Sequence, residues 1–531
     1  MNLLKLLGTV LAILSLNRAI LAATPSPAQA DPEAWVLARK HAAVHRFSTL
    51  FTAQNVRDLL ATDPAIDGAI QWCQQTAVTH VYLESFRGGY QVERQALEHA
   101  RQRFRDAGFL VSGCITTTRV GKPSTGWKGE ISCYTDLPTQ KRLQEVFEFA
   151  SALFDEIMID DFWFTDCACA ECDTARQSQT VSIGDHRYSV AGQTWEDYRC
   201  ELMVRLSRER ILEPARRINP RVKIIIKYPQ WYDRFPERGY EVIRETADFD
   251  RIWVGTETRD YEDPRWGGTV PYEGYFIMRW LGGLGGAKCG GGWYDWLGTT
   301  EATYLEQARQ TVLAGARESL LFCYGGLQQD TGPKNIAALR GCLPELFATA
   351  QAVAQRQAIG IAAYKPANSH PETEARVFDF VGMLGLPLLP CHQFPSNAPA
   401  AFFSIHAWKD PDLTAKLSAF IASGKPVLLT DALAERLGNR IGREAANVRI
   451  LPVKGDPKLL LRLSPDELDA IRVPLLKPLG VTFRAPTQVG LYLFQDGSWV
   501  VENFNQVPVE ATLREQAISL PARGWKFEWR P

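Results

Sequence analysis

The sequence predicts an α/β protein: a (β/α)8 TIM barrel followed by a smaller α/β unit and a short β domain. Two observations predict the barrel. From about residue 40, short apolar runs alternate with amphipathic stretches, which is the rhythm of a parallel sheet with crossover helices. Eight such units extend over about 310 residues, and eight strands close a barrel of this kind. An open doubly wound sheet is the alternative, but it would usually need fewer strands.

The predicted strands are apolar runs rich in β-branched and aromatic residues. They cover residues 43–49, 79–86, 110–118, 156–164, 222–228, 250–257, 275–281 and 319–325. Helices are expected between most of them, because apolar residues there recur at i, i+3 and i+4. The helical stretches are 92–107, 139–153, 195–217, 236–247 and 301–316.

The pattern changes at about residue 356, so we expect the barrel to occupy residues 31–355. Apolar runs at 357–363 and 376–380, strands at 400–406 and 426–429 and a helix at 413–422 predict a second α/β unit over 356–455. Helical periodicity then fades. Residues 489–504 predict a strand–turn–strand within a small β domain, 456–531, while 458–475 fit no element.

The first 30 residues predict a signal peptide. Lys5 precedes an apolar run at 6–16, and an A-x-A triplet at 28–30 supplies a cleavage site. Cleavage after residue 22 or 23 is one alternative, and an uncleaved anchor is another. We expect a secreted or periplasmic protein.

Composition narrows the class of partner. A formal net charge of −1 over 531 residues argues against nucleic acid or an anionic membrane as the main partner. Fifteen Trp are more than folding needs, so a minority could line a carbohydrate site. Eight His are few for a metal-dependent hydrolase or deacetylase, which is therefore disfavoured.

Active sites of such barrels lie at the carboxyl ends of the strands, so polar and aromatic residues there are candidates. The substrate-binding candidates are Glu84, Arg87, Trp163, Lys227, Trp231, Arg279, Trp280, Trp293, Asp295 and Tyr324. Each has a plainer interpretation as well. Glu84 could be an ion-pair partner of Arg87 or Arg119, Lys227 could neutralise the neighbouring acids, and the Trp side chains could pack in the core. Asp295, in a Gly-rich loop at 290–296, is a reserve acid.

Glycoside hydrolysis needs two carboxyl groups across the scissile bond. Asp160 and Asp161 end predicted strand four, and Glu257 ends strand six, two positions away around the barrel. We expect a strand-four Asp as the nucleophile and Glu257 as the acid/base. Since side chains alternate along a strand, one of the two Asp should face the pocket, and we favour Asp160. A capping role for Asp161 is the alternative.

Three closely spaced cysteines, Cys167, Cys169 and Cys172, follow the acids. Zinc commonly takes four ligands, and Cys133, after strand three, is the natural fourth, with Cys200 or Cys289 as alternatives. Four protein ligands leave no open position, so such a zinc would be structural. Free thiols or a disulfide are the alternatives. No organic cofactor is expected.

Cys133 with the C-x-C-x-x-C group resembles the zinc cluster of glycoside hydrolase family 42 β-galactosidases. The resemblance implies a flavodoxin-like fold for 356–455, a small C-terminal β domain and a homotrimer. The catalytic pattern departs from that family, which has an Asn-Glu pair ending strand four and a Glu nucleophile ending strand seven. This chain has Asp160-Asp161 and Arg279-Trp280 there. Residues 159–162, Ile-Asp-Asp-Phe, are more similar to hypothetical glycosyl-hydrolase-like families and to α-galactosidase-type barrels.

These observations predict a secreted glycoside hydrolase that cleaves O-glycosidic bonds in an oligo- or polysaccharide by a retaining two-carboxylate mechanism. The expected partner is a carbohydrate substrate, with no nucleic acid and no membrane contact beyond the signal peptide. The alternative is a carbohydrate-binding barrel without catalytic activity.

Overall fold

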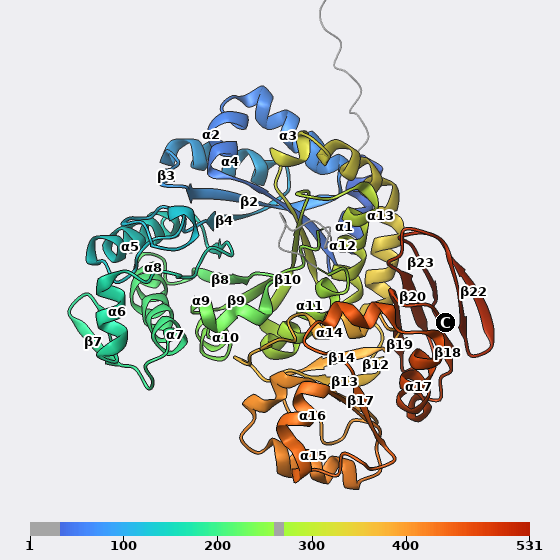
Figure 1. Cartoon of the computed structure of the whole chain (residues 1–531). Helices are drawn as coiled ribbons and strands as arrows, with labels where there is room; N and C mark the ends of the chain where they lie inside the picture. The colour runs from blue at the N-terminus through green and yellow to red at the C-terminus, as the bar shows by residue number, and fades with distance from the viewer. Residues whose placement is uncertain (1–31, 260–269) are drawn as a thin grey trace, which may run out of the picture.

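The computed structural model describes residues 32–259 and 270–531 (Figure 1). The predicted signal peptide lies outside the described residues. Within these two ranges, no helix combines the length and the apolar character that crossing a bilayer requires.

Eight parallel strands close into a barrel, as predicted. In order around the barrel they are β1 (Arg46–Phe51), β2 (Val78–Arg87), β4 (Leu110–Ile115), β5 (Glu156–Ile159), β8 (Lys223–Tyr228), β9 (Arg251–Gly255), β10 (Cys289–Asp295) and β11 (Glu318–Phe322). β11 pairs with β1 and closes the ring. A two-residue strand, β3 (Tyr90–Gln91), extends β2 as a hairpin. The barrel interior is a packed core that includes Tyr82, Trp253 and Trp293.

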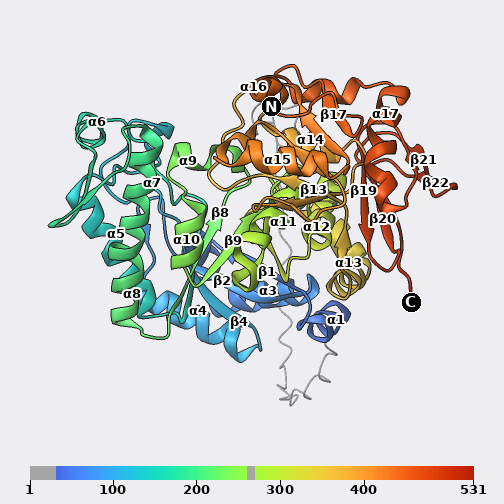
Figure 2. The same ribbon diagram turned by 90° about the horizontal axis from the view of Figure 1, so that it is seen from below.

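The helices pack outside the strands (Figures 1 and 2). They are α1 (Glu33–His41), α2 (Ala53–Leu59), α3 (Asp63–Gln75), α4 (Arg94–Asp106), α5 (Leu137–Ser151), α7 (Trp195–Leu206), α8 (Glu213–Ile218), α9 (Phe235–Arg238), α10 (Val242–Asp248), α12 (Glu301–Leu313) and α13 (Gly332–Ala354). A π-helical turn, Ser207–Leu212, joins α7 to α8, so the predicted helix over 195–217 is continuous. An excursion after β5 adds α6 (Ala170–Gln177), β6 (Thr180–Ile183) and β7 (His186–Ser189).

The prediction of strand seven at 275–281 is wrong. These residues lie in helix α11 (Glu273–Gly285), and the seventh strand is β10. Periodicity misled the prediction because α11 packs both on β9 of the barrel and on the second α/β unit, so apolar residues surround it. The Gly-rich segment taken for a loop is the strand itself. A Cβ on Gly291 would lie 2.3 Å from the carbonyl oxygen of Glu318 on the neighbouring strand, so close packing requires glycine.

The second unit holds five parallel strands in the order β14-β13-β15-β16-β17. The strands are β13 (Ile361–Tyr364), β14 (Leu388–Cys391), β15 (Ala401–Phe403), β16 (Val427–Thr430) and β17 (Val448–Leu451), with α14 (Val377–Gly382), α15 (Leu413–Ala422) and α16 (Asp431–Leu437) between them. Numbered along the chain this order is 2-1-3-4-5, that of flavodoxin-like sheets.

Two small antiparallel sheets complete the chain beside α12 and α13 (Figure 1). One comprises β12 (Ala358–Ile359), β19 (Val489–Phe494), β20 (Trp499–Asn503) and β23 (Trp525–Glu528), and the other β18 (Phe483–Arg484), β21 (Val509–Leu513) and β22 (Gln516–Leu520). The predicted strand–turn–strand is β19–β20. Residues 458–475, which fitted no element, fold mainly as α17 (Pro465–Leu476). β12 falls within the range predicted for the second unit, but it pairs with β19 of the C-terminal β domain. The domain boundaries at 355 and 455 stay predictions.

Candidate active site

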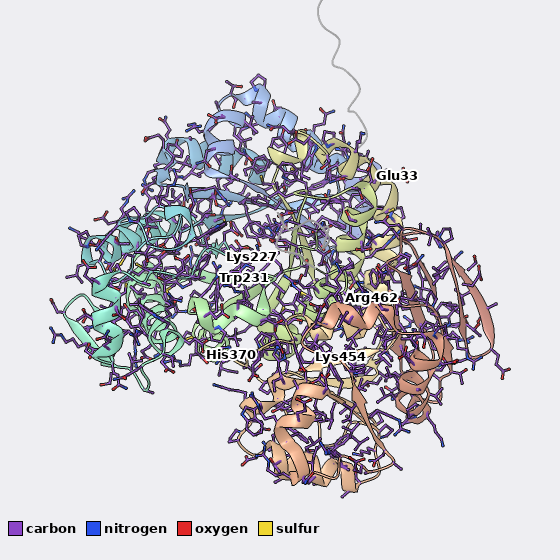
Figure 3. All side chains as sticks on the ribbon, viewed as in Figure 1. Glu33, Lys227, Trp231, His370, Lys454 and Arg462 are labelled. Carbon is purple, nitrogen blue, oxygen red and sulfur yellow. The ribbon has the colours of Figure 1, made fainter. Side chains whose placement is uncertain are left out.

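Lys227, at the carboxyl end of β8, is the centre of the candidate site. Its side chain is 1% exposed, and its Nζ donates to Glu257 Oε1 at 2.8 Å and to Asp161 Oδ2 at 2.9 Å. Asp160 Oδ1 lies 3.6 Å from the same nitrogen. The ammonium also sits 4.1 Å from the ring centre of Trp293, which lies beneath it in the barrel core. Figure 3 labels Lys227, within β8, and Trp231, which follows that strand in the chain.

The strand order explains why these groups meet. β5, β8 and β9 are consecutive neighbours, with Ile159 paired to Ile226 and Lys227 paired to Trp253. Their carboxyl ends therefore reach the mouth of the barrel together. The predicted placement of the strand-four and strand-six acids on the same side of the barrel is confirmed.

Asp160 is the enclosed member of the acid pair. Its side chain is 2% exposed, and it accepts hydrogen bonds from Arg87 at 2.7 Å, from Thr116 at 3.1 Å and from the main-chain N–H of Asp161 at 2.8 Å. Burial alone would raise its pKa, but the charges of Lys227 and Arg87 outweigh burial and hold the pKa below the usual value. Asp160 is therefore an ionised, fully hydrogen-bonded carboxylate.

Asp161 is the accessible member, with 15% of its side chain exposed. Burial raises its pKa to about 8, and the charges of Asp160 and Glu257 add to the rise although Lys227 opposes it. The sequence predicts that only one of the two Asp faces the pocket and favours Asp160, whereas the structure encloses Asp160 and leaves Asp161 as the accessible one. β5 ends at Ile159, so strand alternation does not continue through 160 and 161, and both carboxyls approach Lys227.

Glu84 and Arg87 support Asp160 from β2. Glu84 is fully buried and accepts from Ala53 N and Arg87 Nε, each at 2.8 Å, and from Thr116 Oγ1. Burial raises its pKa although Arg87 bonds to it. Glu84 is thus the ion-pair partner of Arg87 that the plainer interpretation proposed. Arg87, with 20% of its side chain exposed, remains within reach of a ligand.

Asp295 and Arg259 flank Glu257 on the other side. Arg259 bonds to Asp295, and its Nη2 lies 3.6 Å from Glu257 Oε2. Burial raises the pKa of Asp295 to about 6, helped by the charge of Glu257 and opposed by Arg259. Asp295 ends β10, so it stands at the carboxyl end of the true seventh strand.

Several predicted substrate contacts lie elsewhere. Trp163 is buried and donates to Ser207 Oγ at 2.9 Å, while Trp280 is buried in α11 and donates to the carbonyl of Lys365. Arg279 is also on α11, so it does not stand at the end of a barrel strand as predicted. Tyr324 packs on Phe51 and Trp72, outside the barrel. Trp231 stays half-buried near the mouth, in contact with Phe164.

Thr116 is a site residue that the sequence analysis missed. It follows the end of β4 and bonds to both Glu84 and Asp160. Candidates were named at the end of every other strand from two to eight, so the gap at strand three was the signal that could have led to Thr116. A Thr after an apolar run has no feature that separates it from a turn residue.

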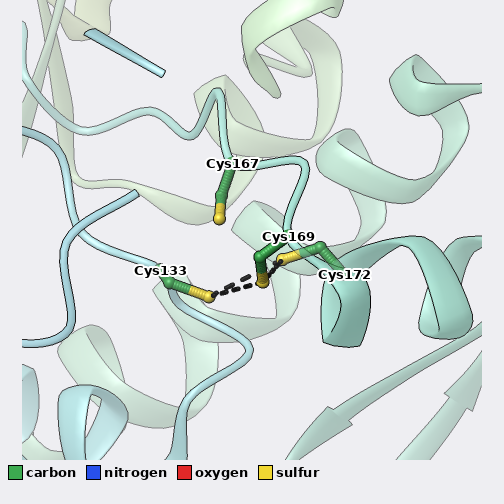
Figure 4. A group of neighbouring side chains, drawn as sticks. All are labelled: Cys133, Cys167, Cys169 and Cys172. Carbon is green, nitrogen blue, oxygen red and sulfur yellow. Dashed lines mark hydrogen bonds between the residues drawn. The ribbon is translucent and has the colours of Figure 1, made fainter. Parts of the chain in front are cut away.

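Four cysteine sulfurs from the segments that follow β4 and β5 gather together, as predicted (Figure 4). The Sγ atoms of Cys133, Cys167, Cys169 and Cys172 all lie within 4.8 Å of one another. Three of the separations are 3.6–3.7 Å. A tetrahedron with Zn–S bonds of ~2.3 Å has edges of ~3.8 Å, so this donor set fits a metal ion. The spacing is too long for disulfides, whose S–S bonds are ~2.05 Å.

Comparison with known proteins assigns the family. A family model described as "Probable glycosyl hydrolase, catalytic domain" matches residues 33–362, more than half of the chain. Uncharacterized protein SSO3021 of Saccharolobus solfataricus is 27% identical over 304 residues, 53% of this chain and 49% of that protein. The match thus spans about half the length of this relative.

A solved structure shares the fold. Alpha-L-fucosidase isoenzyme 2 from Paenibacillus thiaminolyticus superposes with a TM-score of 0.58 at 11% identity, covering 90% of each chain. Apo exo-carrageenase GH42 from Bacteroides ovatus gives 0.49 at 9% identity, covering 91% of this chain and 79% of that one. The closed parallel barrel, the carboxyl groups at its mouth and the match over residues 33–362 lead to one assignment: this chain belongs to the probable glycosyl hydrolase catalytic-domain family.

Proposed function

We propose that this protein is a glycoside hydrolase that cleaves O-glycosidic bonds in an oligo- or polysaccharide. The observation that carries the proposal is the sharing of one buried lysine by Asp161 and Glu257 at the mouth of a glycosyl hydrolase barrel. Two carboxyl groups in different surroundings are what glycoside hydrolysis requires.

Asp161 suits the role of general acid/base. A pKa of about 8 keeps its carboxyl protonated at neutral pH, so it can give a proton to the departing glycosidic oxygen. It is also the more exposed of the two strand-four acids. Asp160, favoured from the sequence as the nucleophile, is enclosed by its hydrogen bonds, so we now assign it to positioning Arg87 and the main chain of Asp161.

Glu257 suits the role of nucleophile, in place of the acid/base role expected from the sequence. It lies between the cations of Lys227 and Arg259, and its carboxylate would attack the anomeric carbon after Asp161 protonates the leaving group. Asp161, then ionised, would take a proton from the water that releases the sugar.

The geometry favours retention of configuration. Asp161 Oδ2 and Glu257 Oε1 accept from the same nitrogen, at 2.9 Å and 2.8 Å. The distance between these two oxygens therefore cannot exceed the sum of those two lengths. Retaining enzymes hold their carboxyl groups ~5–5.5 Å apart, and inverting enzymes ~6.5–9.5 Å.

The test is hydrolysis of a panel of aryl α- and β-glycosides by the wild type, Asp161→Asn and Glu257→Gln. We expect Glu257→Gln to lose several orders of magnitude in kcat, on the scale of a removed catalytic group. Asp161→Asn should keep more activity on substrates with acidic phenol leaving groups, which need no protonation. Near-normal turnover by both variants would disprove the assignment. Glycan binding without hydrolysis by the wild type would support the carbohydrate-binding alternative.

We further propose that the four cysteines hold a structural zinc ion. Four thiolates would complete its tetrahedral shell, so the ion would tie the loop after β4 to the loop after β5 without touching substrate. Metal analysis of the purified protein tests this: we expect about one zinc per chain, lost in Cys133→Ser and kept in Cys200→Ser.

Export is also a proposal, supported by the N-terminal pattern at residues 5–30. Mass spectrometry of protein recovered outside the cytoplasm should find an N-terminus at Asp31, or at residue 23 or 24 for the alternative cleavage sites. The flavodoxin-like strand order supports the proposed trimer by analogy alone, and light scattering would test it.

A further inference from the structure

We propose that Trp127, Phe162 and Phe164 form an aromatic platform that binds a further sugar ring, beyond the bond being cleaved. This inference rests on the proposed function and deepens it, because it makes the substrate a glycan chain of several units rather than a single sugar with a small aglycone.

Trp127 lies against both Phe rings, and one of them directly follows the proposed acid/base in the chain. Trp127, in a 3-10 turn at Trp127–Gly129, stacks on Phe162 with ring centres 5.5 Å apart and planes inclined by 5°. Its ring centre is 6.3 Å from that of Phe164. Phe162 directly follows Asp161 in the chain. A sugar ring lying on the platform would therefore be adjacent to the sugar whose bond Asp161 protonates.

Trp127 is the exposed member of the platform, at 42%, whereas Phe164 is its buried member and supports the other rings from inside. One exposed apolar side chain is common on a protein surface and by itself indicates nothing. What distinguishes Trp127 is that a set of polar contacts fixes the main-chain turn that carries it.

Asp166, five residues after Asp161, fixes the turn. Its Oδ2 accepts from the main-chain N–H of Trp127 at 2.6 Å, and its Oδ1 accepts from Ser124 Oγ at 2.8 Å. Gly126 is needed for this approach, because a Cβ there would lie 2.1 Å from Cγ of Asp166. The side chain of Thr125 accepts from Ala168 N at 2.7 Å.

The cysteine cluster connects the same two loops, since Cys133 belongs to the loop of Trp127, and Cys167 directly follows Asp166. A preorganised aromatic surface loses little entropy when a ligand binds. The apolar C–H face of a sugar ring is the ligand that stacks on such a surface while its hydroxyl groups stay in water.

Trp408 provides a matched control. It is 40% exposed, close to the value for Trp127, but it lies in the second α/β unit and Arg436 and Arg440 lie over its ring, 5.5 and 5.1 Å from the ring centre. Its replacement removes an exposed Trp of similar accessibility without touching the platform.

The experiment is calorimetric titration of Glu257→Gln, which prevents turnover, with cello-, xylo-, malto-, manno- and chito-hexaose and with their monosaccharides. We expect one hexaose to bind more tightly than its monosaccharide. Adding Trp127→Ala should reduce the ratio of monosaccharide Kd to hexaose Kd by about ten-fold, the scale of a truncated aromatic contact. Trp127→Phe should restore part of the loss, and Trp408→Ala should leave the advantage unchanged.

The inference is wrong if no hexaose outbinds its monosaccharide, if Trp127→Ala keeps the full advantage, or if Trp408→Ala loses as much. Hydrolysis of aryl glycosides by the wild type, measured in parallel, separates the two proposals. Hydrolysis without a chain-length advantage overturns the platform and keeps the enzyme. A Trp127-dependent advantage without hydrolysis keeps the platform and overturns the enzyme.

Discussion

At the residue scale, Lys227 brings together the acids of two strand ends, those of β5 and β9. Without a cation, Asp160, Asp161 and Glu257 could not be held so close in a buried site, because each ionised carboxylate would raise the pKa of the others. The three carboxyls in turn raise the pKa of Lys227 although burial opposes the charge, so the lysine stays protonated. One cation thus allows Asp160 to be ionised while Asp161 keeps its proton at neutral pH.

Replacing Lys227 with Met should therefore destabilise the protein, by about 3–5 kcal/mol at pH 7, because buried carboxylates lose their partner. The loss should be smaller at pH 5, because carboxylates that lose the neighbouring ammonium bind protons more readily, and more of them are neutral as the pH falls. Urea unfolding at both pH values measures this. Lys227→Arg is the control, since it keeps the charge. Equal losses at pH 5 and pH 7 would contradict the electrostatic explanation.

The pKa of Asp161 sets an alkaline limit on activity. An acid with a pKa of about 8 holds its proton below that pH and loses it above, so kcat/KM should fall as the pH rises through about 8. Asp161→Asn cannot titrate and should lack this alkaline limb on an aryl glycoside with a good leaving group. A pH–rate profile of both proteins checks the prediction, and a limb that persists in the variant would assign it to another group.

At the element scale, β10 is a strand although its sequence is rich in glycine, and the packing of its neighbours explains why. Gly290, Gly291 and Gly292 each lie where a Cβ would come within 2.5 Å of a neighbour. The neighbours are the Trp253 ring, the Glu318 main chain and Thr311 on α12. The small residues let β9 and β11 approach, and the strand then presents Trp293 below Lys227 and Asp295 at the mouth.

Gly291→Ala should accordingly destabilise the barrel by about 1–3 kcal/mol, the usual cost of overpacking. Gly341→Ala is the matched control: no atom lies within 4 Å of its added Cβ, and it is exposed inside α13. There the same change should stabilise by about 0.5–1 kcal/mol, since Ala favours a helix interior over Gly. Thermal unfolding of both variants gives the comparison, and a neutral Gly291→Ala would contradict the packing argument.

At the scale of the whole molecule, the barrel and the second unit share a core. Helix α11 packs on β9 and on β14, and Phe276 of α11 stacks on Phe378 with ring centres 4.6 Å apart. Buried polar pairs cross the same interface: Asp233 with His406 at 2.8 Å and Glu273 with Arg376 at 2.7 Å. The second unit thus covers the apolar face of α11 and supplies partners for the buried Asp233 and Glu273.

Truncation after residue 355 should therefore yield a barrel that is insoluble or unfolded, because it exposes the apolar face of α11 and leaves Asp233 and Glu273 without partners. Soluble yield, thermal unfolding and binding of an apolar dye, compared with the full chain, measure the effect. A fragment that unfolds at the temperature of the full chain and binds no dye would contradict it.

The sequence by itself determined the class of fold, most strand positions, the acids of strands four and six and the cysteine cluster. These follow from local signals, since apolar runs, charges after them and cysteine spacing are visible within a few residues. The tertiary structure decided those features that depend on contacts between residues far apart in the sequence. The helical state of 275–281 depends on packing from two sides, and the strand state of 289–295 depends on neighbours that only glycine tolerates. The different environments of Asp160 and Asp161 depend on Lys227, Arg87 and Thr116, which lie far apart in the sequence. A pKa follows the charges and burial around a group in three dimensions, so the distinction between adjacent acids exists only in the folded chain.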